Sequence, residues 1–224
     1  MTRTTADAKD VASLISVLRS YAPRRPLTYG ESLQVARRQA AYVRRWARAD
    51  EPDINLIWLL EQQVVPVVFV PSYKLGQESG LTTNAVGGKL TIFLNHQEIP
   101  TRRRFSALHE MKHWIDWDDA DVLHAKLGAG GDPDLRKQMI EWIANEFAAH
   151  VLMPTMLVKR AWFRCQDRPT MANLFNVSLE AMDKRLKRLG LVPEPESTRP
   201  RTYFRSGSVA PDDYAVLEAL SIAA

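Results

Sequence analysis

The stretch His109-Glu110-Met111-Lys112-His113 constrains this chain more than any other part of its sequence. On a helix, residues four apart lie one turn above each other on the same face, so the two histidines can direct both imidazoles at one point. Two imidazoles so placed are two of the protein ligands that a tetrahedral zinc site requires. Glu110 stands beside the first histidine, where its carboxylate could take a proton from water at the metal.

The motif alone does not establish a metal site, because a helix with two solvated histidines would have the same sequence. The surrounding sequence favours a buried helix. Pro100 and Thr101 suit a helix entry. One side of the segment is apolar through Phe105, Leu108, Met111 and Ile115. A polar stripe through His109, His113 and Asp116 would then face the metal, with Asp116 placed to accept a hydrogen bond from a ligand imidazole.

A zinc enzyme needs a third protein ligand and leaves the fourth position to water. The candidate is Glu141, in a second expected helix over residues 140–152 that Pro154 ends. The core face of this helix is formed by Ile140, Ile143, Ala144, Phe147 and Val151. Glu141 and Asn145 are four apart, so Glu141 could bind the metal while Asn145 orients a ligand imidazole from behind. On spacing alone, Glu141 is one acid among many.

The two motifs together are specific. The segment His109–His113, followed by Glu141–Pro154 in the pattern E-x-x-A-N-x-F-A-A-x-x-L-M-P, resembles the ImmA/IrrE family of zinc metallopeptidases without a mismatch at those positions. The resemblance implies that His109, His113 and Glu141 are the zinc ligands and that Glu110 is the catalytic base. It also implies intracellular cleavage of helix-turn-helix repressors, which relieves repression of mobile-element or stress-response genes.

Composition narrows the kinds of partner and the cellular compartment expected for this chain. A net charge of +4 permits an acidic partner but does not demand nucleic acid. The single cysteine, Cys165, excludes an intrachain disulfide and a cysteine-based zinc site, which fits a reducing cytoplasm. Residues 1–10 contain no apolar export signal, and the longest apolar run, residues 64–70, is far too short to cross a bilayer. We therefore expect a cytoplasmic protein without a membrane segment.

The remaining patterns predict helices around a small sheet. Helices are expected over residues 10–19 and 31–49, and strands over 64–70, 81–85 and 89–95. The strand over 89–95 directly precedes the metal helix. At a sheet edge it would hydrogen-bond an extended substrate, although its pattern fits an internal strand equally well. The family resemblance favours the edge role.

A helix-turn-helix-like pattern follows Pro154, with helices over 170–175 and 179–189 and a turn between them. Ser178 suits the N-cap of the second helix and Gly190 its C-terminal cap. Its basic residues are expected outside: Lys184, Arg185, Lys187 and Arg188. They could contact DNA or a protein partner. We favour a protein partner, because the overall charge is modest. A single helix-turn-helix also usually needs to dimerise to bind DNA, and the sequence shows no dimer interface.

We therefore predict an α+β protein: a mostly helical zincin-like metallopeptidase domain with a small three-stranded sheet, followed by a helix-turn-helix-like segment. The expected parts are an N-terminal arm with a short helix (1–30), the metallopeptidase domain (31–158), the helix-turn-helix-like module (159–192), and a linker and tail (193–224) with a helix over 212–223. One Zn²⁺ per chain is expected, and the same ligands accept Mn²⁺ or Fe²⁺. The expected partner is a protein substrate, a helix-turn-helix repressor.

Two questions stay open at this point. The rival hypothesis is a DNA-binding regulator in which zinc is structural or activity is lost, but the intact Glu110 argues against it, because a structural site needs no base. An additional donor for the tetrahedral oxyanion is also expected. Spacing leaves four candidates for that donor: Tyr73, His96, His124 and His150.

Overall fold

The structure is a computed structural model that describes residues 8–61, 64–76, 78–85, 88–128 and 132–193. Its helices are α1 (Ala8–Ser20), α2 (Tyr29–Trp46), α3 (Ile57–Leu60), α4 (Pro100–Asp116), α5 (Ala120–Leu123), α6 (Pro133–Leu152), α7 (Thr155–Cys165), α8 (Arg168–Phe175) and α9 (Leu179–Arg188). Its strands are β1 (Val67–Val70), β2 (Gly80–Asn84) and β3 (Leu90–Asn95), and short 3-10 turns span Ser72–Lys74 and Trp117–Asp119. The predicted α+β class, mostly helical with a three-stranded sheet, is confirmed.

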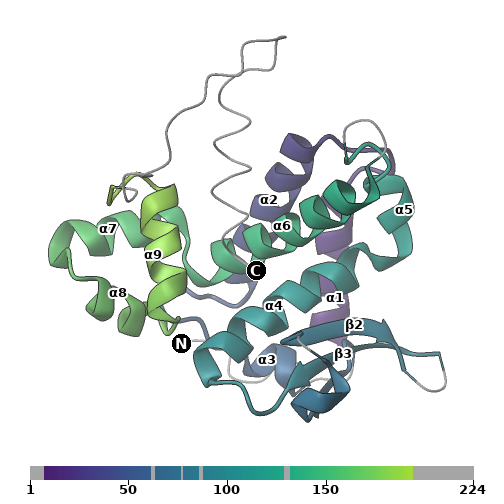
Figure 1. The fold of residues 1–224 in the computed structure, drawn as a ribbon, viewed down its shortest axis with the longest axis horizontal. Helices are drawn as coiled ribbons and strands as arrows, with labels where there is room; N and C mark the ends of the chain where they lie inside the picture. The colour runs from purple at the N-terminus through teal and green to yellow at the C-terminus, as the bar shows by residue number, and fades with distance from the viewer. Residues whose placement is uncertain (1–7, 62–63, 77, 86–87, 129–131, 194–224) are drawn as a thin grey trace, which may run out of the picture.

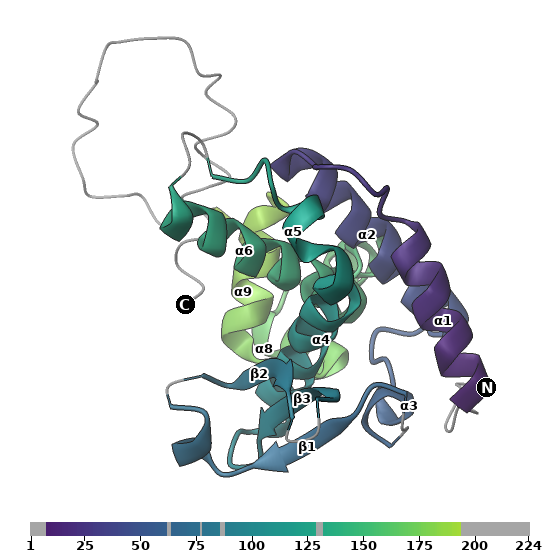
Figure 2. The ribbon, with the colours of Figure 1, turned by 90° about the vertical axis from the view of Figure 1, so that its right-hand side faces the viewer.

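Helix α4 lies at the centre of the described part of the chain. Figures 1 and 2 show it between the small sheet on one side and α6 on the other, with α2 packed along α6. Leu108 and Met111 of α4 and Phe147 of α6 have no exposed surface. Burying such side chains contributes roughly 1.5–3 kcal/mol each before entropy is subtracted, so this contact fixes α4 against α6.

The sheet has the strand order β1-β3-β2, with β1 parallel and β2 antiparallel to β3. β3 is therefore the central strand, and the expectation that residues 89–95 form a sheet edge is wrong. Ile92 and Leu94 point into the core without exposed surface, and the backbone of β3 pairs on both sides. The edge that packs beside α4 belongs to β2.

Helix α1 is part of the core and does not stand apart as an arm. Val11, Leu14 and Leu18 have no exposed surface and join the same hydrophobic cluster as the side chains of α2, α4 and α6. The division of the chain at residues 30, 158 and 192 stays a prediction. The helix expected over 212–223 lies outside the described residues. No helix that the structure describes combines the length and the apolar character needed to span a bilayer.

Helices α8 and α9 have the expected caps. Asn176 adopts a left-handed conformation (φ 52°) between the helices, and the Ser178 hydroxyl oxygen accepts a hydrogen bond from the N–H of Ala181 at 3.1 Å. Gly190, at φ 65°, allows the chain to turn away after α9. These contacts explain the two helices but do not test DNA binding.

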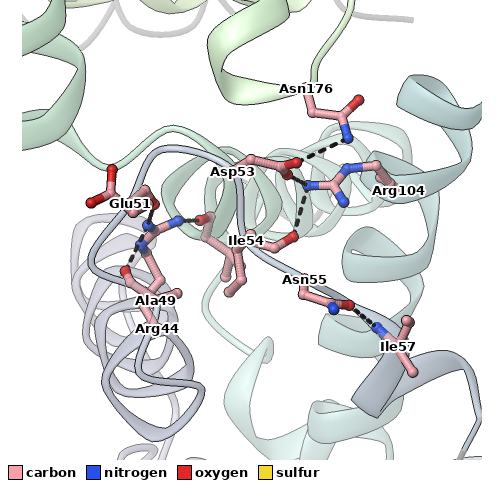
Figure 3. A network of polar contacts seen from close by, with 10 residues as sticks. Arg44, Ala49, Glu51, Asp53, Ile54, Asn55, Ile57, Arg104 and Asn176 are labelled. Atoms are coloured by element: carbon pink, nitrogen blue, oxygen red, sulfur yellow. Dashed lines mark hydrogen bonds and ion pairs between the residues drawn. The ribbon is translucent and has the colours of Figure 1, made fainter. Parts of the chain in front are cut away.

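A polar network shown in Figure 3 ties the α8–α9 turn to the helical body. The Asp53 carboxylate accepts hydrogen bonds from Arg104 of α4 at 2.6 Å and from the Asn176 side chain at 3.3 Å. Nearby, the buried Arg44 donates to the carbonyls of Val151 and Ala49 at 2.8 and 2.7 Å. The bonds of Asp53 link the turn between α8 and α9 to helix α4 of the body, and those of Arg44 link α2 to the end of α6.

Candidate metal centre

Helix α4 presents both histidines of the motif on one face. Pro100 stands in its first turn, where a missing N–H breaks no intrahelical hydrogen bond. The apolar residues that bury the opposite side are Ala107, Leu108, Met111 and Ile115. The Nε2 atoms of His109 and His113 lie 3.0 Å apart, so one turn of helix brings the two imidazoles to a common point.

Helix α6 supplies the third group. Its start is fixed by Asp132, whose side chain accepts hydrogen bonds from the N–H groups of the first turn, and by Pro133. Packing of α6 on α4 then places one Glu141 carboxylate oxygen 3.0 Å from His109 Nε2 and the other 3.6 Å from His113 Nε2. Within the described residues, His109, His113 and Glu141 are the cluster whose ligand atoms all lie within 4.8 Å of one another.

The geometry of this cluster fits a tetrahedral metal ion. At metal–ligand distances of ~2.0–2.1 Å, neighbouring ligand atoms of a tetrahedron lie about 3.3 Å apart, which matches the separations of the three groups. The side-chain oxygen of Asn145 lies 2.9 Å from His109 Nδ1 and accepts a hydrogen bond from the N–H of that atom. When the neutral ring keeps its proton on Nδ1, the lone pair of Nε2 is free to bind a cation together with the Glu141 carboxylate.

The charges of the cluster are coupled. Burial would raise the pKa of the Glu141 carboxyl, but its hydrogen bonds with His109 and His113 outweigh burial and hold that pKa far below its ordinary value. Burial would lower the pKa of the His109 imidazole, whereas the hydrogen bond with Glu141 and the charge of Glu110 raise it overall. Glu141 is therefore held in its ionised form, and its negative charge favours a divalent ion between the two imidazoles.

The cluster is reachable from solvent. The Glu141 side chain is 45% exposed, and the His109 and His113 side chains are 15% and 21% exposed. A surface cavity of about 530 Å³ reaches Glu141 along the first turns of α6. The exposed carboxylate and the partly exposed imidazoles would let water and substrate reach an ion held between them, which a catalytic metal site requires.

Glu110 lies on the sheet side of α4 and is 6% exposed. Its carboxylate oxygen Oε2 accepts a hydrogen bond of 2.7 Å from the hydroxyl of Thr82 on β2. Thr82 was not among the residues that the sequence singled out. No spacing rule marks it, since the contact joins residues 28 positions apart and depends on how β2 packs against α4.

The predicted role of Asp116 is wrong. Its carboxylate accepts two hydrogen bonds of 2.6 Å from the buried Lys112 ammonium, and His124 Nε2 lies 3.6 Å from it. Neither Lys112 nor His124 belongs to the metal cluster. Of the two residues expected to support the ligands, the structure brings only Asn145 to them.

The expectation that the basic residues of α9 all point outwards is also wrong. Arg185 is 3% exposed and donates to the carbonyl of Met153 at 2.9 Å and to the Thr155 hydroxyl at 3.1 Å. Arg188 forms an ion pair of 2.6 Å with the fully buried Glu146. Lys184 pairs with Glu180 on the same helix, and Lys187 is half-buried. Two of these four side chains, those of Arg185 and Arg188, therefore hold α9 against the body.

Two of the four candidate oxyanion donors lie in other clusters. His124 contacts Asp116, and His150 Nε2 lies 3.1 Å from a carboxylate oxygen of Glu146. His96 contacts the carbonyl of Val70 at the end of β1. Tyr73 is 79% exposed. Tyr73 and His96 stay candidates for this role.

A family model described as the IrrE N-terminal-like domain, which belongs to a peptidase family, matches residues 62–187, more than half of the chain. Among solved structures, a Mycobacterium tuberculosis transcriptional regulator matches with 15% identity and a TM-score of 0.47, over 82% of this chain and 53% of that one. The chain thus spans about half the length of that regulator. A search of curated proteins gives no match.

Proposed function

Because the chain belongs to the ImmA/IrrE family of metallopeptidases, we propose that it is a zinc-dependent endopeptidase. The observation that carries this proposal is the convergence of His109, His113 and Glu141 around a point that one metal ion could occupy. Glu110 stands next to His109 in the sequence and supplies a carboxylate that can act as a general base. A purely structural zinc site would not need such a base.

In this proposal His109, His113 and Glu141 hold the ion, and Asn145 keeps the His109 ring in its binding tautomer. When bound, the ion supplies Lewis-acid polarisation of the scissile carbonyl and activation of water. Glu110 takes the proton from the attacking water and passes it to the leaving amine. The identity of the ion as zinc rests on the donor set of two imidazoles and one carboxylate, which also accepts Mn²⁺ or Fe²⁺.

The strand that would align the substrate is β2 rather than β3. In the described sheet β2 pairs on one side only, and it packs against α4 beside Glu110. An extended peptide added to the free side of β2 would gain main-chain hydrogen bonds and run past the metal ligands. This arrangement supports hydrolysis of an internal peptide bond in a segment that can become extended.

The family points to a helix-turn-helix repressor as the substrate. We expect the zinc-loaded protein to cut a repressor encoded beside its own gene at a single peptide bond, and to lose this activity in a chelator. The measurement is mass spectrometry of the fragments after incubation of the two purified proteins. An intact repressor, mixed with an enzyme that cuts a fluorogenic peptide, would contradict this substrate without contradicting the peptidase activity.

The contacts of α9 do not favour the rival reading as a DNA-binding regulator. A helix that reads DNA needs several free basic side chains for phosphates, whereas Arg185 and Arg188 are occupied by Met153 and Glu146. We propose instead that α8 and α9, within the module of residues 159–192, support the metallopeptidase body and help to position a protein substrate.

A further inference from the structure

Strand β2 holds the side chain of Glu110 in two ways. The first is the Thr82 hydroxyl, which lies 2.7 Å from Glu110 Oε2 and 3.0 Å from the Glu110 main-chain oxygen. Thr82 is 8% exposed and Glu110 is 6% exposed, so water competes little for this contact. Thr82 is itself fixed by the register of the sheet, where it stands opposite the fully buried Ile92.

The second constraint is the absence of a side chain at Gly80. A Cβ atom at this position would lie 2.8 Å from Glu110 Cγ, 3.1 Å from Glu110 Oε1 and 3.2 Å from a methyl carbon of Leu94. Gly80 does not have the positive φ angle that would by itself require glycine. Its role is therefore to make room, since any side chain would push Glu110 away from the strand.

A general base works only when its oxygen is aimed at the proton that it removes, and small errors of placement cost large factors in rate. A glutamate side chain has three rotatable bonds, so a buried carboxylate without a partner would sample several orientations. The hydroxyl of Thr82 removes this freedom from one oxygen of the carboxylate. The same strand offers its free edge to the substrate.

We propose that Thr82 is a positioning residue, which aims the Glu110 carboxylate at the reacting water, and that Gly80 keeps the space which this orientation needs. The inference rests on the proposed peptidase function for its kinetic consequence. Its structural part, the coupling between Thr82 and Glu110, stands independently of activity.

The kinetic test uses a fluorogenic peptide selected from a library for cleavage by the wild-type protein. Thr82→Val keeps the shape of the side chain and removes the hydrogen bond to a charged group, so kcat is expected to fall on the order of ten- to a hundredfold. KM and zinc content are expected to stay close to wild type, because the Thr82 hydroxyl contacts Glu110 and not the three residues of the metal cluster. Thr82→Ser, which keeps the hydroxyl, restores most of kcat.

Thr91→Val is the matched control. Thr91 lies on the neighbouring strand β3, is 3% exposed, and donates its hydroxyl proton to the Lys89 carbonyl at 2.9 Å rather than to Glu110. This variant loses a hydrogen bond of a buried threonine but keeps wild-type kcat. A Thr82→Val enzyme with wild-type kcat, or a Thr91→Val enzyme with an equal loss, would overturn the positioning role.

A double-mutant cycle tests the coupling without any catalysis. Urea unfolding of the metal-free protein is measured for wild type, Thr82→Val, Glu110→Ala and the double variant. The destabilisation caused by Thr82→Val is expected to shrink strongly once Glu110 is absent, and additive effects would contradict the contact. If the wild-type protein binds zinc but cuts no peptide, the proposed function fails, while this cycle still decides whether Thr82 holds Glu110.

Discussion

Replacing Glu110 by Gln is expected to lower the rate of peptide hydrolysis by about 10²–10⁴-fold, the usual contribution of a general base, while zinc stays bound. The amide is nearly the same size as the carboxylate, and its oxygen can still accept the hydrogen bond from Thr82. It cannot take a proton from water. The measurements are kcat on a fluorogenic peptide and the zinc content of the same preparation by elemental analysis.

Glu51→Gln is a suitable control for this variant. Glu51 is exposed, and its side chain takes no part in the metal cluster, so the control removes one negative charge without touching the site. We expect it to keep wild-type activity. If Glu110→Gln retained both zinc and activity, the base would lie elsewhere. If no preparation cut peptides although all bound zinc, the regulator hypothesis would gain the advantage.

The largest expected effect on stability comes from Glu146. Its side chain has no exposed surface and forms ion pairs with Arg37 of α2 at 2.5 Å and Arg188 of α9 at 2.6 Å, while His150 Nε2 lies 3.1 Å from it. Glu146→Ala would leave the two arginines without their shared partner and would loosen α9 from the body. Removing one member of a buried ion pair costs ~3–5 kcal/mol when the remaining charge stays buried. Because Arg37 and Arg188 are 46% and 25% exposed, we expect a loss near the lower end of this range in the free energy of unfolding.

Chemical denaturation measures this loss, and Glu180→Ala is the control. Glu180 also forms an ion pair, with Lys184 at 2.8 Å, but its side chain is 76% exposed. Exposed pairs contribute roughly 0–1 kcal/mol, so the control should remain close to wild type. Equal destabilisation by the two variants would show that Glu146 is not the anchor that its contacts suggest.

The same carboxylate gives the stability a defined pH dependence. Burial would raise the pKa of Glu146, but the hydrogen bond with His150, the charge of Arg188 and the hydrogen bond with Arg37 lower it from 4.5 to about 2. A carboxyl with a lowered folded-state pKa stabilises the protein fully above its unfolded pKa and loses that contribution as the pH falls through its folded pKa. Wild-type stability should therefore decline between about pH 4.5 and 2 more steeply than that of Glu146→Ala.

The sequence could predict the metal helix because its evidence is local. Two histidines one turn apart meet wherever a helix forms, and their Nε2 atoms do lie together. Glu141 was different, since spacing could not choose it among the acids of the chain. Its position against His109 depends on the packing of α6 on α4, so the family resemblance was needed to name it.

The expectations that failed depend on contacts between distant segments. Strand order is set by which strands pair, so the alternation of residues 89–95 could not reveal that β1 and β2 flank β3. Arg185 falls on the polar side of the α9 pattern, yet its long stem carries the guanidinium to the buried carbonyl of Met153. No sequence pattern marks Thr82, because its contact with Glu110 forms only when β2 packs against α4.

The central claim is that one metal ion held by His109, His113 and Glu141 makes this protein a peptidase. The most direct measurement removes all metal with a chelator, returns zinc in known equivalents, and follows bound zinc and peptide hydrolysis together. For the wild-type protein we predict no hydrolysis without metal and full activity at about one equivalent, while His109→Ala and Glu141→Ala lose both tight zinc binding and activity. Full zinc occupancy in both variants, or hydrolysis by the metal-free protein, would contradict the account.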